Sequence, residues 1–308
     1  MKIKRSILFI IFILALCLQA CGPKEKEENR DGGKTEDTED KSGDKDNTET
    51  PDKEQDQQEE PPAAQITINE QVLYEKDDIR ITATAFSEDE FLGPEIKLLI
   101  ENNSTIDATV QAREVSVNGL MIDPTMSSDV AAGKKANDSL AFFTEDLEQN
   151  AIDKIAVVEL RFSIFNTDTF EEIAETDTIT ILTSVSDSFV QTYDDSGDVI
   201  YEKDKIRIIE KGILTNELFG PELRIYIENN SEKNITVQAQ KVSVNGFMVE
   251  PIFSSEVSPG KKRNDGITFL DLEDDIVAIT QVELSFVILD TDSFEKIDES
   301  DTIEIKYD

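Results

Sequence analysis

The chain has 308 residues and a formal net charge of -37, because 67 Asp and Glu outnumber 30 Lys and Arg. Repulsion between like charges argues against the phosphates of nucleic acid or of anionic lipids as partners. The chain holds no His and no Trp, and both Cys lie within the first 21 residues, so imidazole-based catalysis and metal binding by His are excluded.

The N-terminal segment has the pattern of an export signal. Three basic residues, Lys2, Lys4 and Arg5, precede an apolar run from Ile7 to Leu18. This run is too short for a transmembrane helix, which needs about 20 apolar residues, but it suits the hydrophobic region of a signal peptide. We therefore predict that residues 1–20 are a signal peptide.

The residues that follow the apolar run predict a lipid anchor. The segment Leu18–Gly22 (LQACG) resembles a bacterial lipobox, in which the signal peptide is cut before a lipid-modified cysteine. This resemblance implies a diacylglyceryl thioether on Cys21, whose two acyl chains give stable membrane anchoring. The alternative is an ordinary secretory signal with an incidental Cys21. With Cys21 lipidated, we expect the chain on the extracytoplasmic face of the cell membrane, without a free thiol or a disulfide.

Residues 21–65 are predicted to form a disordered acidic tether. Between Gly22 and Pro62 the chain has no aliphatic, aromatic, Met or Cys side chain, and residues 22–65 carry seven positive and 16 negative charges. Such a composition cannot bury a core. Extended at about 3.5 Å per residue, the tether would reach on the order of 150 Å.

The rest of the chain repeats itself once. The segment Tyr74–Ile81 (YEKDDIRI) returns 127 positions later as Tyr201–Ile208 (YEKDKIRI). Without gaps, Phe91–Asp138 and Leu218–Asp265 share 27 identical residues in 48 positions. The identity indicates a tandem duplication.

Each repeat has the pattern of an all-β unit. Segments such as IRITATAF and VELRFSIF alternate apolar and polar residues, which is typical of strands. About seven short strands per repeat suit a sandwich of two antiparallel sheets with apolar inner faces and charged outer faces. We therefore predict immunoglobulin-like β-sandwiches at residues 66–184 and 199–308, joined by a turn-rich linker over 185–198.

Turn residues mark hairpins at matching places in both repeats. Asn118–Gly119 and Asn245–Gly246 lie between alternating segments, and Asn-Gly favours the positive φ angles of a type I′ turn. Polar turns are also expected within Phe165–Phe170 and Leu289–Phe294. One helical turn is expected near Glu145–Asp153.

The order of these motifs resembles a known class of domain. A strand, Glu-Asn-Asn-Ser, another strand, Val-Asn-Gly, then Pro259-Gly260 and Phe269 are similar to the telokin-like, immunoglobulin-like domains of surface lipoproteins in Gram-positive bacteria. The resemblance covers both repeats, although the first has Ala132 where the second has Pro259. Because that family shares no catalytic residue, the resemblance implies a fold and a surface location but no reaction.

Acidic turn residues are one candidate site, because carboxylate and amide oxygens bind Ca²⁺ without His or Cys. The alternative is that these residues close turns and keep the surface soluble. No EF-hand loop is present, and no other cofactor is expected. The calcium candidates are Asp168, Asp290 and Asp292, together with Asn166, Asp298, Asp194, Asp195 and Asp198.

Basic pairs and apolar pairs are candidate partner contacts. The basic pairs suit an anionic wall polymer, or else are solvated loops. The apolar pairs break strand alternation before a Gly-Pro bend, where they are either exposed to a partner or turned into the core. The residues are Lys134, Lys135, Lys261 and Lys262 for the first kind, and Phe91, Leu92, Leu218 and Phe219 for the second.

No group of residues in the sequence indicates a particular reaction, and we expect that the protein is not an enzyme. With 67 acidic residues, chance carboxylate pairs are inevitable, and no long loop is present to build a sequestered cleft. Two functions remain: an adaptor that binds an envelope or host protein through a loop or sheet edge, and a structural spacer without a specific ligand. A calcium-binding surface protein is a further alternative.

Overall fold

The described part of the chain belongs to one compact unit, Pro62–Asp308. The computed structural model describes residues 65–89, 92–123, 126–216, 220–269, 272 and 278–307. The predicted signal peptide and residues 21–64 of the predicted tether, Cys21 included, lie outside the described residues, as do Phe91, Leu218 and Phe219. No described helix is long and apolar enough to cross a membrane.

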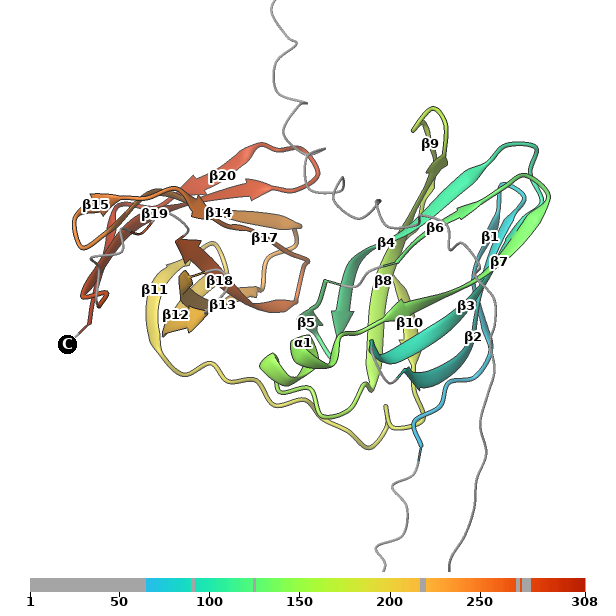
Figure 1. The fold of residues 1–308 in the computed structure, drawn as a ribbon, viewed down its shortest axis with the longest axis horizontal. Coiled ribbons are helices and arrows are strands. Elements are labelled where there is room, and N and C mark those ends of the chain that lie inside the picture. The colour runs from blue at the N-terminus through green and yellow to red at the C-terminus, as the bar shows by residue number, and fades with distance from the viewer. Residues whose placement is uncertain are drawn as a thin grey trace, which may run out of the picture. The chain divides into compact units, whose positions relative to one another are not determined.

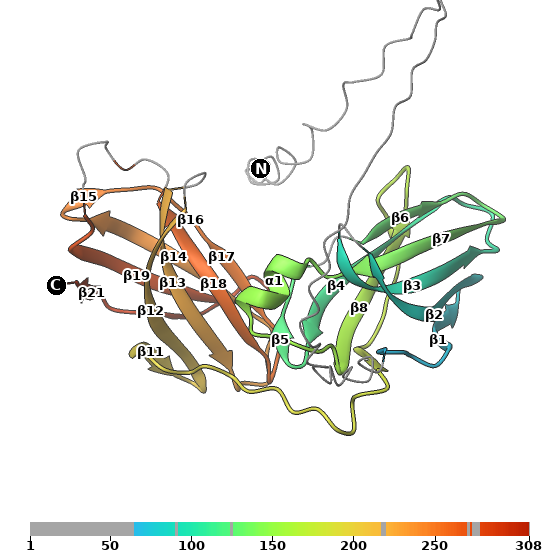
Figure 2. The same cartoon turned by 60° about the horizontal axis from the view of Figure 1, so that its bottom comes forward.

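The first repeat folds into two antiparallel sheets, as predicted (Figures 1 and 2). One sheet has the order β1-β2-β3-β7, and in the other β4 and β8 are central. The first sheet is built from β1 (Gln71–Lys76), β2 (Ile79–Asp89), β3 (Gly93–Asn102) and β7 (Lys134–Ala141). The second is built from β4 (Ala108–Val117), β5 (Leu120–Met121), β6 (Ser127–Val130), β8 (Val157–Asn166), β9 (Glu172–Glu175) and β10 (Ile179–Leu182).

The second repeat has the same arrangement of sheets. The order β11-β12-β13-β18 corresponds to β1-β2-β3-β7, and β14 and β19 are central in the other sheet. The first sheet contains β11 (Asp198–Lys203), β12 (Ile206–Asn216), β13 (Gly220–Asn229), β16 (Pro251–Ile252) and β18 (Lys262–Phe269). The second contains β14 (Ile235–Val244), β15 (Phe247–Met248), β17 (Ser254–Val257), β19 (Gln281–Asp290), β20 (Lys296–Glu299) and β21 (Ile303–Lys306).

Alternation along the strands decides which side chains enter the core. In β8 the residues Val158, Leu160, Phe162 and Ile164 are buried, and those between them are only half-buried. They share one hydrophobic core with residues of the facing sheet such as Leu98. Burying an aliphatic or Phe side chain stabilises the folded state by about 1.5–3 kcal/mol. The inner faces of each sandwich therefore account for the period of two in the sequence.

In the repeated Glu-Asn-Asn-Ser segment, the first Asn stabilises the turn that follows through hydrogen bonds of its buried side chain. The Asn102 side-chain amide donates to the carbonyl oxygens of Ile106 and Val130, at 2.8 Å each. Its oxygen accepts from the backbone N–H of Ser104 at 3.0 Å. Asn102 is 1% exposed, so these bonds satisfy a buried amide that would otherwise be costly. Asn229 makes the equivalent bonds in the second repeat.

The predicted hairpins and helical turn are confirmed. Asn118 and Gly119 have φ angles of 51° and 84°, and Asn245 and Gly246 have the same values. The short helix α1 (Thr144–Gln149) overlaps the expected helical segment Glu145–Asp153. The expected number of about seven strands per repeat is too low: the described residues form ten in the first repeat and eleven in the second, because short strands of two to four residues such as β5, β6 and β9 are separate elements.

Candidate functional site

The two repeats meet at the Asn-Gly hairpin of the first. Leu120 of β5 pairs with Lys262, the first residue of β18, in a single parallel bridge. The Lys262 backbone N–H donates to the Gly119 carbonyl oxygen at 3.0 Å. A sheet of the first repeat thereby continues into a sheet of the second. We call the contact of residues 114–123 and 159 with residues 258–264 the inter-repeat joint.

Basic side chains of β18 and of the loop before it are paired with acids of the first repeat. Lys261 forms an ion pair with Glu159, and Arg263 forms one with Asp123. Arg263 also lies 3.0 Å from Asp265 on its own strand. Burial opposes the charge of Arg263, but the two carboxylates outweigh it and hold the pKa of Arg263 above its ordinary value.

Tyr193 of the linker ties the hairpin to β18. Its hydroxyl donates to the Asn118 carbonyl oxygen at 2.7 Å. The Lys262 ammonium lies 4.3 Å from the centre of the Tyr193 ring, within range of a cation–π interaction. Lys261 and Lys262, predicted as contacts for an external partner, are therefore engaged within the chain.

A β-bulge directs Glu114 towards the joint. The pairing of β4 with β8 shifts register at this residue, whose φ is 49°. Its carboxylate lies 2.9 Å from the Arg161 guanidinium and 3.4 Å from both the Asn234 amide and the Ser258 hydroxyl of the second repeat. Bulges commonly re-aim a side chain in this way.

The apolar residues of this hairpin are enclosed. Leu120 is 1% exposed and belongs to a core cluster that includes Tyr226 and Ile209 of the second repeat. Met121 is 5% exposed and belongs to the core of the second repeat. We call residues Asn118–Met121 the covered hairpin.

The equivalent hairpin of the second repeat is open to solvent. Phe247 and Met248 align with Leu120 and Met121, yet they are 56% and 72% exposed. We call residues Asn245–Met248 the free hairpin. Ile252, four residues further along the chain, is also 60% exposed.

The Asn-Gly turn of the covered hairpin is also in close contact with its surroundings, whereas that of the free hairpin is not. A Cβ atom placed on Gly119 would lie 2.9 Å from the Tyr193 hydroxyl oxygen, whereas one on Gly246 would meet open space. The φ angles of the two turns are the same, so the difference comes from what lies beside each turn. The second repeat therefore presents an uncovered copy of a surface that the first uses for binding.

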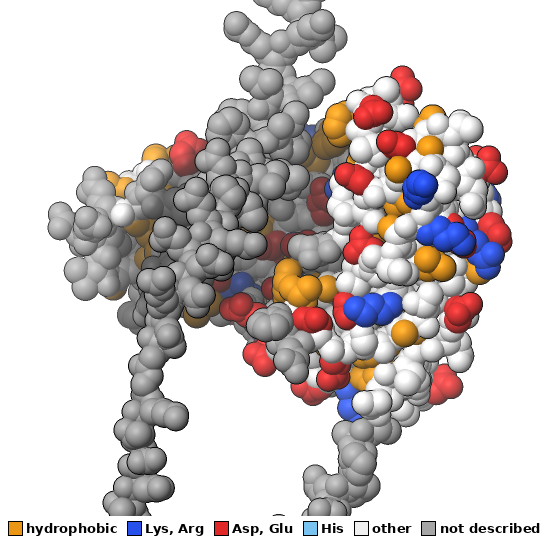
Figure 3. Space-filling view, turned by 45° about the vertical axis from the view of Figure 1, so that its right-hand side comes forward, with side chains coloured by type: hydrophobic (Ala, Val, Ile, Leu, Met, Phe, Trp, Pro, Cys, Tyr) orange, Lys and Arg blue, Asp and Glu red, His pale blue; other side chains and the backbone are white. Residues whose placement is uncertain are grey.

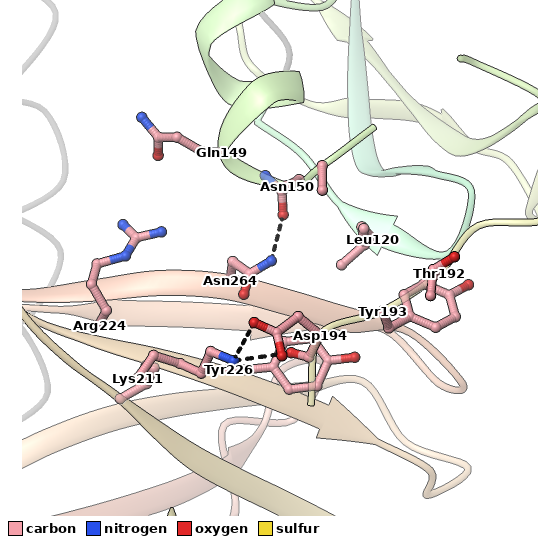
Figure 4. A pocket seen from close by; sticks show the side chains of 12 residues that line it. Leu120, Gln149, Asn150, Thr192, Tyr193, Asp194, Lys211, Arg224, Tyr226 and Asn264 are labelled. Atoms are coloured by element: carbon pink, nitrogen blue, oxygen red, sulfur yellow. Dashed lines mark hydrogen bonds and ion pairs between the residues drawn. The ribbon is translucent and has the colours of Figure 1, made fainter. Parts of the chain in front are cut away.

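A cavity of about 290 Å³ lies beside the joint (Figure 4). Its wall contains a hydrogen bond from the Asn264 amide to the Asn150 side-chain oxygen at 3.0 Å and an ion pair between Lys211 and Asp194 at 2.8 Å. The Tyr226 hydroxyl is buried without a hydrogen-bond partner among the described residues, and burial raises the pKa of Tyr226. Because Asp194 is paired with Lys211, its carboxylate is not free to act as a base here.

The described candidate contacts of the first repeat lie at the surface. Lys134 and Lys135 begin β7 and are exposed, and Lys135 forms an ion pair with Glu101. Leu92 is 40% exposed, with its backbone N–H bonded to the Asp89 carboxylate at 2.9 Å. Acidic and basic side chains are interspersed over the face of this repeat that Figure 3 shows.

Several of the calcium candidates have partners inside the chain. Asp290 lies 2.9 Å from the Lys233 ammonium, which with the backbone N–H of Ser293 lowers the pKa of Asp290 to about 2. Asp298 accepts from the Tyr201 hydroxyl at 2.9 Å. The Asn166 oxygen accepts from backbone N–H groups of its own turn. Within the described residues no three His, Cys, Asp or Glu side chains are placed to hold a metal ion, and calcium binding stays a prediction.

Phe247 and Met248 were not singled out from the sequence. The signal is the bulky apolar pair that follows Val-Asn-Gly in both repeats, on strands of only two residues. Such a pair at a sheet edge indicates a contact, because neither side chain is needed to continue the strand alternation. The sequence does not distinguish which copy is covered.

Comparisons with known proteins give no family. No protein-family profile matches the chain, and no curated protein matches it. Among solved structures, the chain is similar to the Salmonella enterica SafA pilin in complex with the SafB chaperone, at 11% identity and a TM-score of 0.24 over 76% of this chain and 98% of that one. It is also similar to the YadV chaperone, at 11% identity and a TM-score of 0.24 over 75% and 100% of the two chains. The immunoglobulin-like description rests on the two sheets of each repeat and their shared cores.

Proposed function

We propose that the chain is a lipid-anchored, extracytoplasmic protein without catalytic activity that binds another protein through its free hairpin. The observation that carries this proposal is the contrast between two homologous hairpins. The covered hairpin is buried by a β-sandwich, whereas Phe247 and Met248 of the free hairpin face solvent. Adjacent exposed apolar residues at a sheet edge are typical of protein contacts.

The anchoring part of the proposal rests on the sequence. The lipobox-like segment Leu18–Gly22 supports a lipid on Cys21, and the acidic segment after it supports a solvated tether. Together they would hold the binding surface in the space outside the membrane.

A structural spacer is the second candidate, favoured by the joint itself. Ion pairs, a backbone bridge and buried Leu120 link the two repeats, as a stiff spacer requires. A spacer has no partner at the free hairpin, so a search for one there separates the two functions.

A photoreactive phenylalanine analogue placed at position 247 of the full chain, in the cells that produce it, tests the proposal. The matched control carries the analogue at Phe294, which is 77% exposed on the same repeat and so is more accessible to random collisions. We expect a defined protein adduct from position 247 and little from position 294. Equal adducts from both positions, or none from position 247, would overturn the proposal in favour of the spacer.

A further inference from the structure

We infer that the partner of the free hairpin is the first repeat of a second copy of this chain, so that copies join head to tail as the two repeats do within one chain. This inference rests on the proposed binding function of the free hairpin and names its partner. The inter-repeat joint is the template. It joins the covered hairpin of the first repeat to β18 of the second, and the homologues of these two surfaces are the free hairpin of the second repeat and β7 of the first.

The homologue of β18 is the edge strand β7. In the described residues β7 pairs only with β3, so its outer backbone groups are available for a new bridge. Lys134, Lys135 and Asn137 are exposed, whereas Lys262, Arg263 and Asn264 of β18 are half-buried against the first repeat. In a head-to-tail contact, Lys135 of one copy would take the place of Lys262 beside the free hairpin of another copy.

For one ion pair of the joint, both residues have an identical residue at the aligned position of the other repeat. Lys134 aligns with Lys261, and Glu283 aligns with Glu159, so the internal pair of Lys261 with Glu159 predicts a pair of Lys134 with Glu283 between copies. Lys134 is exposed, and among the described residues the Glu283 carboxylate accepts a single neutral hydrogen bond at 3.0 Å, from the Ser243 hydroxyl. Both partners are therefore available to a second copy.

The residues that align with a second polar contact of the joint are also complementary, although neither residue type is conserved between the repeats. Glu114 of the joint contacts Asn234, and their aligned residues are Lys241 and Asp107. A cation and an anion thus stand where the template has a carboxylate and an amide, although within the chain Lys241 pairs with Glu299 and Asp107 accepts from the backbone N–H of Ala132. Opposite charges at matching places favour the correct register of two copies.

The contact between copies lacks some of the template's interactions. Ala136 stands where β18 has Arg263, so the ion pair of Arg263 with Asp123 has no equivalent. Association between copies also loses translational freedom, which the internal joint does not. We therefore expect a concentration-dependent contact, which anchoring of the copies on one membrane would favour by raising their effective concentration.

Charge reversal with rescue tests the inference. The purified full chain is studied by sedimentation at about 0.15 M salt, where a Debye length of about 8 Å screens the net negative charge. The variants are Lys134→Glu, Glu283→Lys and the double variant, with Lys76→Glu as control because it makes the same charge change on β1, at the other edge of the sheet.

We expect oligomers of the wild-type chain to grow with concentration, since an open head-to-tail assembly keeps an unused surface at each end for a further copy. Each single reversal should weaken the association constant about tenfold, and the double variant should restore it, because its charges are again opposite. The control should associate like the wild type. A chain that stays monomeric, single reversals without effect, or a double variant no better than the singles would overturn the inference. An adduct at position 247 with a different protein, together with a monomeric chain, would refute self-association while leaving the proposed function intact.

Discussion

Met121 and Met248 occupy the same position in the two repeats, but their surroundings differ. Met121 is enclosed in the core of the second repeat, and Met248 is 72% exposed. Truncation to Ala leaves a cavity only where the side chain is surrounded. The cost of the same substitution therefore reports directly on the joint.

We predict that Met121→Ala lowers the free energy of unfolding by about 2–5 kcal/mol. Met248→Ala should change it by less than about 0.5 kcal/mol in dilute solution. Urea denaturation of the full chain measures both values. Similar losses for the two variants would show that the joint does not bury Met121.

Asp290 has a depressed pKa that depends on Lys233. Its pKa of about 2 lies below the ordinary value of about 3.9, so the charged form is favoured by folding. The resulting stabilisation is present above about pH 4 and is lost as the pH falls towards 2. The first repeat has Asn166 at the aligned position, which does not titrate.

We predict that Lys233→Ala raises the pKa of Asp290 towards its ordinary value. An NMR titration of the side-chain carboxyl carbon measures this shift. Lys296→Ala is the matched control, because Lys296 pairs with Glu299 and not with Asp290. An Asp290 titration unchanged by Lys233→Ala would rule out the ion pair as the cause.

Among the elements, the linker has a structural role at the joint. Tyr193 contacts the covered hairpin through its hydroxyl and β18 through its ring. The two contacts can be removed separately, since Phe keeps the ring and Ala removes both.

We predict that Tyr193→Phe lowers the free energy of unfolding by about 1 kcal/mol, the usual net contribution of one hydrogen bond. Tyr193→Ala should cost about 1–2 kcal/mol more, because it also removes the ring beneath the Lys262 ammonium. Chemical denaturation of the two variants gives the difference. Equal costs would exclude a contribution from the cation–π contact.

Local elements were predictable because local rules decide them. Period-two alternation places Val158 and Leu160 on one face of β8, and Asn-Gly at 118–119 adopts the two positive φ angles that its turn requires. The duplication was visible because the repeats still share long identical segments. These features depend on residues close together in the sequence or on direct comparison of its two halves.

The joint was not predictable from the same patterns. Asn118–Met121 (NGLM) and Asn245–Met248 (NGFM) are nearly identical in sequence and opposite in exposure. Their difference comes from which partner lies beside them, and that depends on long-range packing. The pairs of Lys261 with Glu159 and of Arg263 with Asp123 likewise join residues more than 100 positions apart.

For the whole molecule, attachment to the membrane is proposed to depend on Cys21. Two acyl chains on this residue would give stable anchoring. We predict that Cys21→Ser moves most of the chain from the membrane fraction to the soluble extracytoplasmic fraction. Cys17→Ser is the matched control, since Cys17 lies within the predicted signal peptide. Retention of Cys21→Ser in the membrane fraction would argue against the lipid anchor.

Amide hydrogen exchange of the full chain at low and high concentration tests most directly the claim that the free hairpin is an unused copy of the covered one. We predict that β5 and the start of β18 are protected at both concentrations, because the joint lies within one chain. β15 and residues 134–137 of β7 already pair with β14 and β3 within one chain, so we predict that their amides exchange more slowly still at high concentration than at low concentration. Exchange of β15 and β7 that does not change with concentration would contradict the account.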